Sequence, residues 1–289
     1  MGKATDDFLG LDIGGTNIRA ARVDGEGRVL DRRSVPSPRD AEAVTRLCID
    51  LVAEMGSTAT ASVGIGVPGQ VDFAAQEVLS GGYVDLSSLP FATRVAQATG
   101  LGVTIDNDAT MALIGEVAIG AALGLAHVAI LTIGTGIGGA VLDRGVVLRG
   151  RRAAGLLGHL TVVPNGRPCV CGRLGCVETE SSGTAFGIHL AEAGLPEGTT
   201  AEDLLARLGD PVADQVLLRW ATPLRAAIDS VIAVLAPEAV VIGGGAGAAA
   251  VAALARVPAR KSWFEAPVLA AVLGGDAGVI GAALASRRQ

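Results

Sequence analysis

Three side chains that could take part in chemistry follow one short apolar run. Asp106, Asn107 and Asp108 come directly after the strand-like residues 101–105 and open a helix-like run that ends near Gly120. Polar groups at the C-terminal end of a strand are where α/β proteins bind ligands. A carboxylate at a helix N-terminus can instead cap free N–H groups. From these residues alone, both roles are open for Asp108: a helix cap or a reactive carboxylate.

Two glycine turns have the composition of phosphate-binding segments. Residues 12–17 read DIGGTN, and residues 134–139 read GTGIGG. Glycine permits positive φ and lets backbone N–H groups approach phosphate oxygens closely. The Asp12 carboxylate can also hold a hydrated Mg²⁺ ion. A plain hairpin turn is the alternative for the first segment. The candidate phosphate-binding residues are Asp12, Gly14, Gly15, Thr16, Asn17, Gly134, Thr135, Gly136 and Gly138.

A third glycine turn, Gly243-Gly244-Gly245, follows the apolar run 239–242 and precedes a helix-like run. A strand, a glycine turn and a helix form the setting of a dinucleotide-binding motif, and Glu265 lies where its acidic ribose partner is expected. A nicotinamide or flavin enzyme is therefore an alternative, although it leaves the other two turns unexplained. Residues 134–139 do not fit that motif, because an apolar strand follows them instead of a helix.

Most of the cysteines lie in one loop. Cys169, Cys171 and Cys176 fall within eight residues, downstream of His159, and Cys48 stands apart. Three thiolates and one imidazole are the closed tetrahedral set that holds structural Zn²⁺. Such crowding in a chain of cytosolic character favours a metal over disulfides. We therefore predict a zinc site formed by His159, Cys169, Cys171 and Cys176.

Composition narrows the class of protein. The 289 residues are 50% hydrophobic, which is enough for one large domain or two. A net charge of −6 argues against a nucleic-acid partner, and 3% aromatic residues leave few stacking platforms. The longest uncharged stretch, 239–255, is broken by glycines and is short for a membrane span. With no secretory signal visible, we expect a cytoplasmic protein that does not enter a membrane.

The pattern of elements repeats. Five identities align residues 11–25 with residues 131–145 at an offset of 120, and the order of elements matches as well. We predict two related α/β domains with a cleft between them, residues 1–106 plus a C-terminal helix within 277–289, and residues 107–276 with the cysteine loop. The strand-like runs are 8–13, 17–23, 28–35, 62–67, 101–105, 127–133, 137–142, 146–148 and 239–242; the further helix-like runs are 41–55, 88–99, 184–193, 201–208, 212–235 and 278–287.

Taken together, these segments resemble the ROK family of sugar kinases, in the actin-like ATPase (ribonuclease H-like) superfamily, over nearly the whole chain. Residues 64–72 (GIGVPGQVD) are similar to the family's GxGxPGxVD signature, and residues 107–109 with Glu116 to its NDAN…GE segment. The two turns resemble its phosphate motifs, and residues 237–245 its adenosine-side segment. Gly158-His159 followed by residues 169–178 (CVCGRLGCVE) resembles its long and specific zinc signature.

The resemblance implies ATP- and Mg²⁺-dependent phosphorylation of a sugar hydroxyl. Asp108 would be the general base, and Gly243, Gly244 and Gly245 would lie on the nucleotide side. Family members often form homodimers, and we expect one here. The family's repressors carry a DNA-binding domain before the first phosphate turn, and with that turn at Asp12 we expect none. The implied sugar-binding residues are Gly66, Pro68, Gly69, Asn107, His159 and Glu178.

Two departures from the family pattern concern the acceptor. The family usually has a sugar-binding Glu in the run GExGH, and Leu156 takes its place here; residues 80–83 (SGGY) also lack an Asn and a Trp that are common there. Without this carboxylate, a buried sugar hydroxyl would have no hydrogen-bond partner, which costs roughly 1–3 kcal/mol of binding free energy. A C7-cyclitol of the valiolone type is therefore an alternative acceptor to a hexose, and a non-catalytic sugar-binding protein is the alternative from another class. ATP and polyphosphate both remain open as phosphoryl donors.

Overall fold

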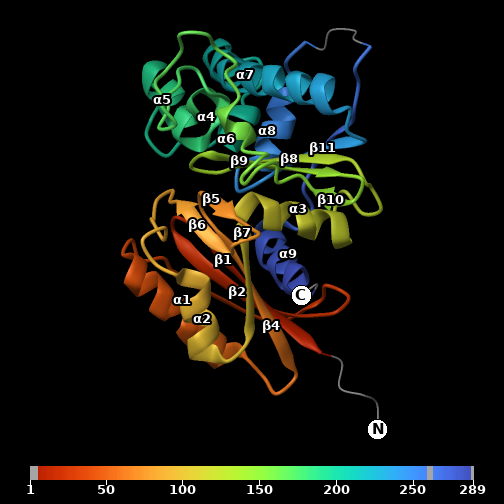
Figure 1. Cartoon of the computed structure of the whole chain (residues 1–289). Coiled ribbons are helices and arrows are strands. Elements are labelled where there is room, and N and C mark those ends of the chain that lie inside the picture. Colours follow the sequence, from red (N-terminus) through yellow and green to blue (C-terminus); the bar gives the residue numbers. More distant parts are fainter. Residues whose placement is uncertain (1–5, 259–262, 288–289) are drawn as a thin grey trace. The chain divides into compact units, whose positions relative to one another are not determined.

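The computed structural model describes residues 6–258 and 263–287. Residues 1–5 and 288–289 of the predicted N-terminal domain, and 259–262 of the predicted C-terminal domain, lie outside this range. The chain divides by contact into two compact units, one of residues 1–124, 147–154 and 275–289, the other of 125–146 and 155–274. Figure 1 follows the chain through both units. We describe each by itself as the N-terminal and the C-terminal unit.

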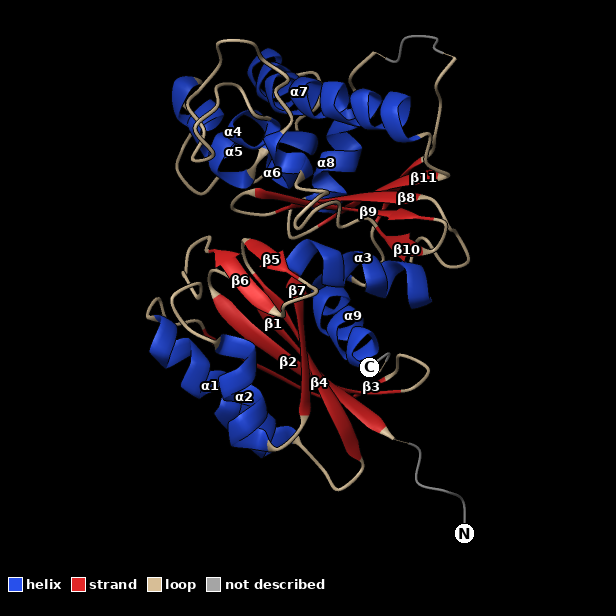
Figure 2. Ribbon diagram, in the orientation of Figure 1, coloured by secondary structure: helices blue, strands red, loops and turns tan. Residues whose placement is uncertain are grey.

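The N-terminal unit is a five-stranded mixed sheet with helices on both faces (Figure 2). An antiparallel meander, β3-β2-β1, is extended by the parallel strands β4 and β7, so that the ends of β1, β4 and β7 meet at one edge. A short hairpin, β5–β6, lies beyond β4. The elements are β1 Asp7–Ile13, β2 Asn17–Asp24, β3 Val29–Pro36, α1 Ala41–Met55, β4 Thr60–Val67, β5 Gln70–Asp72, β6 Glu77–Ser80, α2 Phe91–Thr99, β7 Gly102–Asn107, α3 Asp108–Ile119 and α9 Ala277–Ser286.

The C-terminal unit repeats this arrangement. Its sheet has the order β10-β9-β8-β11-β12, again a meander followed by two parallel strands. Its core is built on the long helix α7, whose Trp220 packs edge to face on Phe186. The elements are β8 Val128–Ile133, β9 Ile137–Asp143, β10 Val146–Val147, the 3-10 turn η1 Leu157–His159, α4 Val177–Ser181, α5 Gly183–Glu192, α6 Ala201–Leu205, α7 Pro211–Leu235, β11 Ala239–Gly243, α8 Gly247–Leu254 and β12 Val268–Ala270, with the 3-10 turn η2 Gly274–Asp276 before α9.

The two sheets confirm the predicted class, an α/β protein built from two related halves. The registers also correct the alignment between them. Ile13 pairs with Ile18 across the first turn, whereas Ile133 pairs with Ile137 across the second, so the second turn is one residue shorter. The offset is therefore 120 before the turn and 119 after it, and Ala20 and Ala140 are not equivalent.

Helix α3 belongs to the N-terminal unit, on the other side of the boundary predicted after Asp106. Its backbone touches that of α9, because a Cβ on Gly115 would lie 2.5 Å from the Ala277 carbonyl oxygen and one on Gly281 would lie 1.7 Å from the Met111 carbonyl oxygen. Glycines at these positions let two helices approach until their backbones meet. This contact between residues far apart in the sequence makes α3 part of the N-terminal unit.

Some local elements differ from the sequence prediction. The helix predicted over 88–99 begins only at Phe91, because Pro90 stands at its N-terminal flank. Strands β5 and β6 were not predicted, since each is only three or four residues long. Among the described helices, none has the length and apolar character that a bilayer span requires.

Candidate functional site

The end of β7 places Asn107 and Asp108 in different roles. Asn107 is the N-cap of α3, where its Oδ1 accepts from the N–H groups of Ala109 (3.0 Å) and Thr110 (3.3 Å). Its Nδ2 donates to the Gly69 carbonyl oxygen at 2.9 Å. Asp108 is the first helical residue, and its Oδ1 accepts from the Ala109 N–H at 2.8 Å. The cap is therefore Asn107, and it ties the end of β7 to the turn after β4.

Asp108 and Asp12 form a pair of poorly hydrated carboxylates. Burial raises the pKa of Asp108 to about 6, against the hydrogen bonds from Ala109 and Asn107. Burial and then the charge of Asp108 raise the pKa of Asp12 to about 7, against the attraction of Arg19, whose Nη1 lies 3.7 Å from Asp12 Oδ2. Carboxylates held in this way suit proton transfer or cation binding.

Glycines make room around these carboxylates. A Cβ on Gly66 would lie 3.4 Å from both the Asp108 Cα and the Asp12 Oδ1, so Gly66 lies between the two acids. Gly69 has a φ of +93°, and a Cβ there would lie 2.0 Å from the Ser80 carbonyl oxygen. The tight turn at Gly69 presents its own carbonyl to Asn107. The structure thus brings Gly66, Gly69 and Asn107, three of the predicted sugar-binding residues, to one end of the first sheet.

Tyr83 is a site residue that the sequence analysis noted only as a departure. Its hydroxyl donates to the Ile13 carbonyl oxygen, and its ring covers Gly15, whose Cβ would lie 3.3 Å from Tyr83 Cδ1. Burial, then Asp108 and Asp12, raises the pKa of its hydroxyl. One signal could have drawn attention to it, since it is the single tyrosine of the chain.

The first turn exposes backbone donors at the end of β1. The Gly14 N–H donates to the Asn17 carbonyl oxygen at 3.0 Å, which closes a four-residue loop. No hydrogen bond among the described residues uses the N–H groups of Gly15 and Thr16, and both residues are exposed. Free N–H groups beside Asp12 are what a phosphate-binding turn requires.

The second turn is held in place by hydrogen bonds from the first residues of helix α5. The Gly134 N–H donates to the Gly136 carbonyl oxygen at 3.0 Å. Outside the hairpin, the Gly134 carbonyl accepts from the Gly183 N–H at 2.8 Å, and the Thr135 carbonyl accepts from Thr184 Oγ1 at 2.8 Å. With its carbonyl groups engaged, the turn leaves the N–H groups of Thr135 and Gly136 without a partner among the described residues.

The third glycine turn packs against the second. Gly244 has a φ of +81°, and a Cβ there would lie 2.4 Å from the Ile133 carbonyl oxygen; the Ala246 N–H donates to that same oxygen at 3.0 Å. The segments predicted to bind the nucleotide and its phosphates are therefore neighbours within the C-terminal unit. The dinucleotide alternative fails, because Glu265 is exposed in the loop before β12 and not at the C-terminal end of a strand.

Glu178 reaches the second turn from the start of α4. Its Oε2 accepts from the Ile137 N–H at 2.9 Å, and a Cβ on Gly136 would lie 2.5 Å from that oxygen. Glu178, a predicted sugar-binding residue, therefore lies against the second glycine turn of its own unit. Leu156 lies beside η1 and is half-buried, so an acidic group is absent from the position where the family usually has one.

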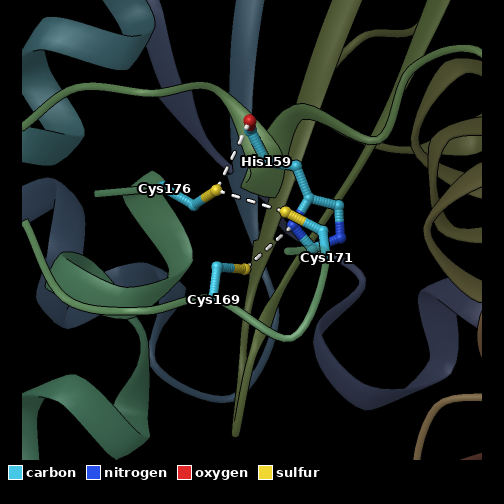
Figure 3. A group of neighbouring side chains, drawn as sticks. All are labelled: His159, Cys169, Cys171 and Cys176. Carbon is cyan, nitrogen blue, oxygen red and sulfur yellow. Dashed lines mark hydrogen bonds between the residues drawn. The ribbon is translucent and has the colours of Figure 1, made fainter. Parts of the chain in front are cut away.

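The predicted metal ligands come together in a loop of the C-terminal unit (Figure 3). The ligand atoms of His159, Cys169, Cys171 and Cys176 all lie within 4.8 Å of one another. The Cys171 and Cys176 sulfurs are 3.6 Å apart, and Cys169 Sγ lies 3.5 Å from His159 Nδ1. The fourth cysteine, Cys48, is buried in α1 of the N-terminal unit.

The Cys171–Cys176 and Cys169–His159 distances are close to those of a tetrahedral zinc centre, and the four ligand atoms together spread over up to 4.8 Å. Zn–S bonds of about 2.3 Å and Zn–N bonds of about 2.0 Å at a tetrahedral angle put two sulfurs roughly 3.8 Å apart and a sulfur and a nitrogen roughly 3.5 Å apart. Gly172 and Gly175, with φ of +86° and +66°, turn the loop so that three cysteines face one centre. The donor set and its geometry therefore fit Zn²⁺.

Comparison with known proteins gives a consistent result. The profile of the ROK family matches residues 8–289. A glucokinase of Thermotoga maritima is 35% identical over 305 aligned residues, covering 96% of this chain and 96% of that protein. An N-acetylmannosamine kinase of Escherichia fergusonii is 34% identical and covers 97% of this chain and 98% of its own.

Solved structures agree with the curated relatives. The crystal structure of a ROK family glucokinase from Streptomyces griseus, in complex with glucose and AMPPNP, superposes with a TM-score of 0.86. Its sequence is 33% identical, and the match covers 98% of this chain and 100% of that one. A match over 98% of the chain extends through both units.

Proposed function

This chain belongs to the ROK family, and on that premise we propose that it is an ATP-dependent kinase of a sugar or sugar-like acceptor. The observation that carries the proposal is that Asp108 is a poorly hydrated carboxylate and that Asn107, not Asp108, is the N-cap of α3. A carboxylate that is not the N-cap can accept a proton from a bound hydroxyl.

In the proposed reaction, Asp108 accepts the proton of the acceptor's primary hydroxyl as that oxygen attacks the γ-phosphorus of ATP. The new O–P bond forms as the bond to the β,γ-bridging oxygen breaks, and ADP leaves. The Asp108 pKa of about 6 suits a general base, because the carboxylate is charged at neutral pH and still basic enough to take a proton.

Residues near Asp108 would hold the acceptor. Asn107, Gly66, Pro68 and Gly69 would line its pocket, and His159 and Glu178 would bind hydroxyl groups, as the family resemblance implies. Glu178 is supported by its fixed position against the Ile137 N–H. The residues that would bind the nucleotide and its phosphates are Asp12, Gly14, Gly15, Thr16, Asn17, Gly134, Thr135, Gly136, Gly138, Gly243, Gly244 and Gly245.

Two metals complete the proposal. Mg²⁺, bound with the nucleotide near Asp12, would neutralise charge on the phosphoryl oxygens. Zn²⁺ would be structural, held by His159, Cys169, Cys171 and Cys176, and would fix the loop that leads into α4 and Glu178. Because the four protein ligands close the zinc coordination shell, the zinc would take no part in phosphoryl transfer.

One observation favours a second acceptor class. Leu156 provides no hydroxyl acceptor where the family usually has Glu, so an acceptor lacking the matching hydroxyl loses nothing there. A C7-cyclitol meets that condition and keeps a primary hydroxyl for Asp108. It stands as the alternative to a hexose.

The test is ADP release with Mg-ATP over a panel of hexoses, N-acetylhexosamines and C7-cyclitols, with Asp108→Asn as control. We expect turnover on at least one acceptor and a loss of at least roughly a thousandfold in Asp108→Asn, with unchanged ATP binding. Turnover on a cyclitol alone would select the alternative acceptor. No ADP release with any acceptor of the panel, or full activity of Asp108→Asn, would refute the proposed function.

A further inference from the structure

Arg149 lies against the residue that precedes Asn107 and Asp108. Its Nη2 and Nε both donate to Asp106 Oδ2, at 2.7 and 3.2 Å. Asp106 is 5% exposed, and burial raises its pKa while the Arg149 guanidinium opposes that rise. A forked, charge-assisted contact to a buried carboxylate fixes the orientation of both groups.

The same guanidinium stacks on an aromatic ring. The Arg149 Cζ lies 3.7 Å from the centre of the Phe73 ring, which leaves the guanidinium little freedom to move. Phe73 also accepts through its carbonyl oxygen from Gln76 Nε2 at 2.6 Å, and Gln76 Oε1 accepts from the Ile105 N–H at 2.6 Å. Side chains between β5 and β6 thus hold the end of β7, which is an edge strand of the sheet that the described residues form.

The contact continues into the catalytic segment. Asp106 Oδ1 accepts from the Asn107 N–H at 2.8 Å, while Oδ2 binds Arg149. Asn107 in turn caps α3 and binds the Gly69 carbonyl. One buried carboxylate therefore connects Arg149 to the backbone that sets the direction of Asp108.

We propose that Arg149 is a positioning residue for phosphoryl transfer, acting through Asp106 to fix Asn107 and the base Asp108. The inference rests on the proposed function and deepens it, since neither Arg149 nor Asp106 belongs to the residues that the family resemblance implies. Arg149 touches neither Asp108 nor a reacting atom; its effect passes through the Asp106 carboxylate.

The variant Arg149→Met keeps the apolar stem and removes the guanidinium. We expect kcat to fall by roughly 10- to 100-fold with KM for ATP changed less than about threefold, because a base displaced by an ångström loses rate and not nucleotide affinity. Arg149→Lys keeps the charge and loses the fork and the stacking, so it should recover part of kcat.

The same segment provides a matched control. Arg152 pairs with Asp72 at 3.4 Å and is 58% exposed, so Arg152→Met removes an ion pair that does not reach Asp106. Its kcat should stay within about twofold of the parent. In an Asp106→Asn background, Arg149→Met should lower kcat by less than about threefold further, because the route it acts through is already broken.

Wild-type kcat in Arg149→Met would overturn the proposal, as would an undiminished further loss in the Asp106→Asn background. If the wild-type chain turns over no acceptor, amide hydrogen exchange separates the two hypotheses. Faster exchange over residues 105–110 in Arg149→Met, but not in Arg152→Met, would support the positioning role alone. Unchanged exchange there would refute it, whatever the activity.

Discussion

At the scale of residues, the surroundings of Asp12 and Asp108 decide what each carboxylate can do. Both lose hydration, and their mutual repulsion adds to the effect on Asp12, so the pair is poised to release or take protons near neutral pH. Neither shift stabilises the fold, because a raised carboxyl pKa means that the folded state disfavours the charge. Function and stability are therefore opposed at these two residues.

The pH dependence of the reaction follows from Asp108. Only its carboxylate can accept a proton, and its pKa is about 6. At saturating Mg-ATP, where the cation keeps Asp12 charged, kcat should therefore fall about tenfold per pH unit below pH 6 and level off above it. A pH–rate profile from pH 5 to 8 on the preferred acceptor measures this. A profile that stays flat down to pH 5 would contradict the assignment of Asp108 as the base.

Asp12→Asn should stabilise the fold as it abolishes activity. The Asp12 pKa of about 7 lies above the ordinary value of 3.8, so the wild-type protein loses stability as pH rises from about 4 to about 7. The loss is on the order of 4 kcal/mol, at about 1.4 per pKa unit. Thermal melts at pH 5 and pH 8 should show the advantage of Asp12→Asn growing with pH, and Mg²⁺ should reduce it.

At the scale of elements, the glycines between α3 and α9 act as spacers. Gly281→Ala would place a methyl group 1.7 Å from the Met111 carbonyl oxygen, so the helices would have to separate, at roughly 1–3 kcal/mol or more. Gly187 in α5 is the control, since a Cβ there meets nothing within 4 Å. Gly187→Ala should be neutral or stabilising by up to about 1 kcal/mol. Equal melting temperatures for the two variants would show that α3 and α9 do not depend on this contact.

Elements with strong local signals were predictable. The turns at 12–17 and 134–139 and the cysteine loop combine residue type with close spacing. The predicted turns join the strands expected of them, and the four predicted ligands form one cluster. Contacts between distant residues were not predictable in this way. Nothing near Arg149 in sequence indicates Asp106, and nothing near α3 indicates α9, because both contacts arise from packing that a local pattern does not encode.

At the scale of the whole molecule, the described residues form two hydrophobic cores. Leu11, Ile65 and Phe91 belong to the core of the N-terminal unit, and Val177, Trp220 and Ile242 to that of the C-terminal unit. The cysteine loop is connected to the second core, because Trp220 Nε1 donates to the Ser182 carbonyl oxygen at 3.0 Å just after α4. Loss of order in the cysteine loop should therefore destabilise the C-terminal unit before the N-terminal unit.

Removal of zinc tests this directly. We expect about one Zn²⁺ per chain, lost in Cys176→Ser and retained in Cys48→Ala, whose thiol is not a ligand. A chelator should lower the melting temperature and speed amide exchange in α4 and α7, while β1 and β4 keep their protection. Protein purified without zinc, or loss of protection spread evenly over both units, would count against the structural site.

The last helix has a consequence for how the protein is made. Gly10 and Gly64 let α9 lie directly on β1 and β4, where a Cβ on either glycine would come within 1.8 Å of an α9 carbonyl oxygen. Helix α9 thus covers strands β1 and β4, both of which leave the ribosome more than two hundred residues before it. Until α9 emerges, one face of that sheet stays uncovered. A nascent chain in this state needs protection from aggregation while the C-terminal unit is still being translated.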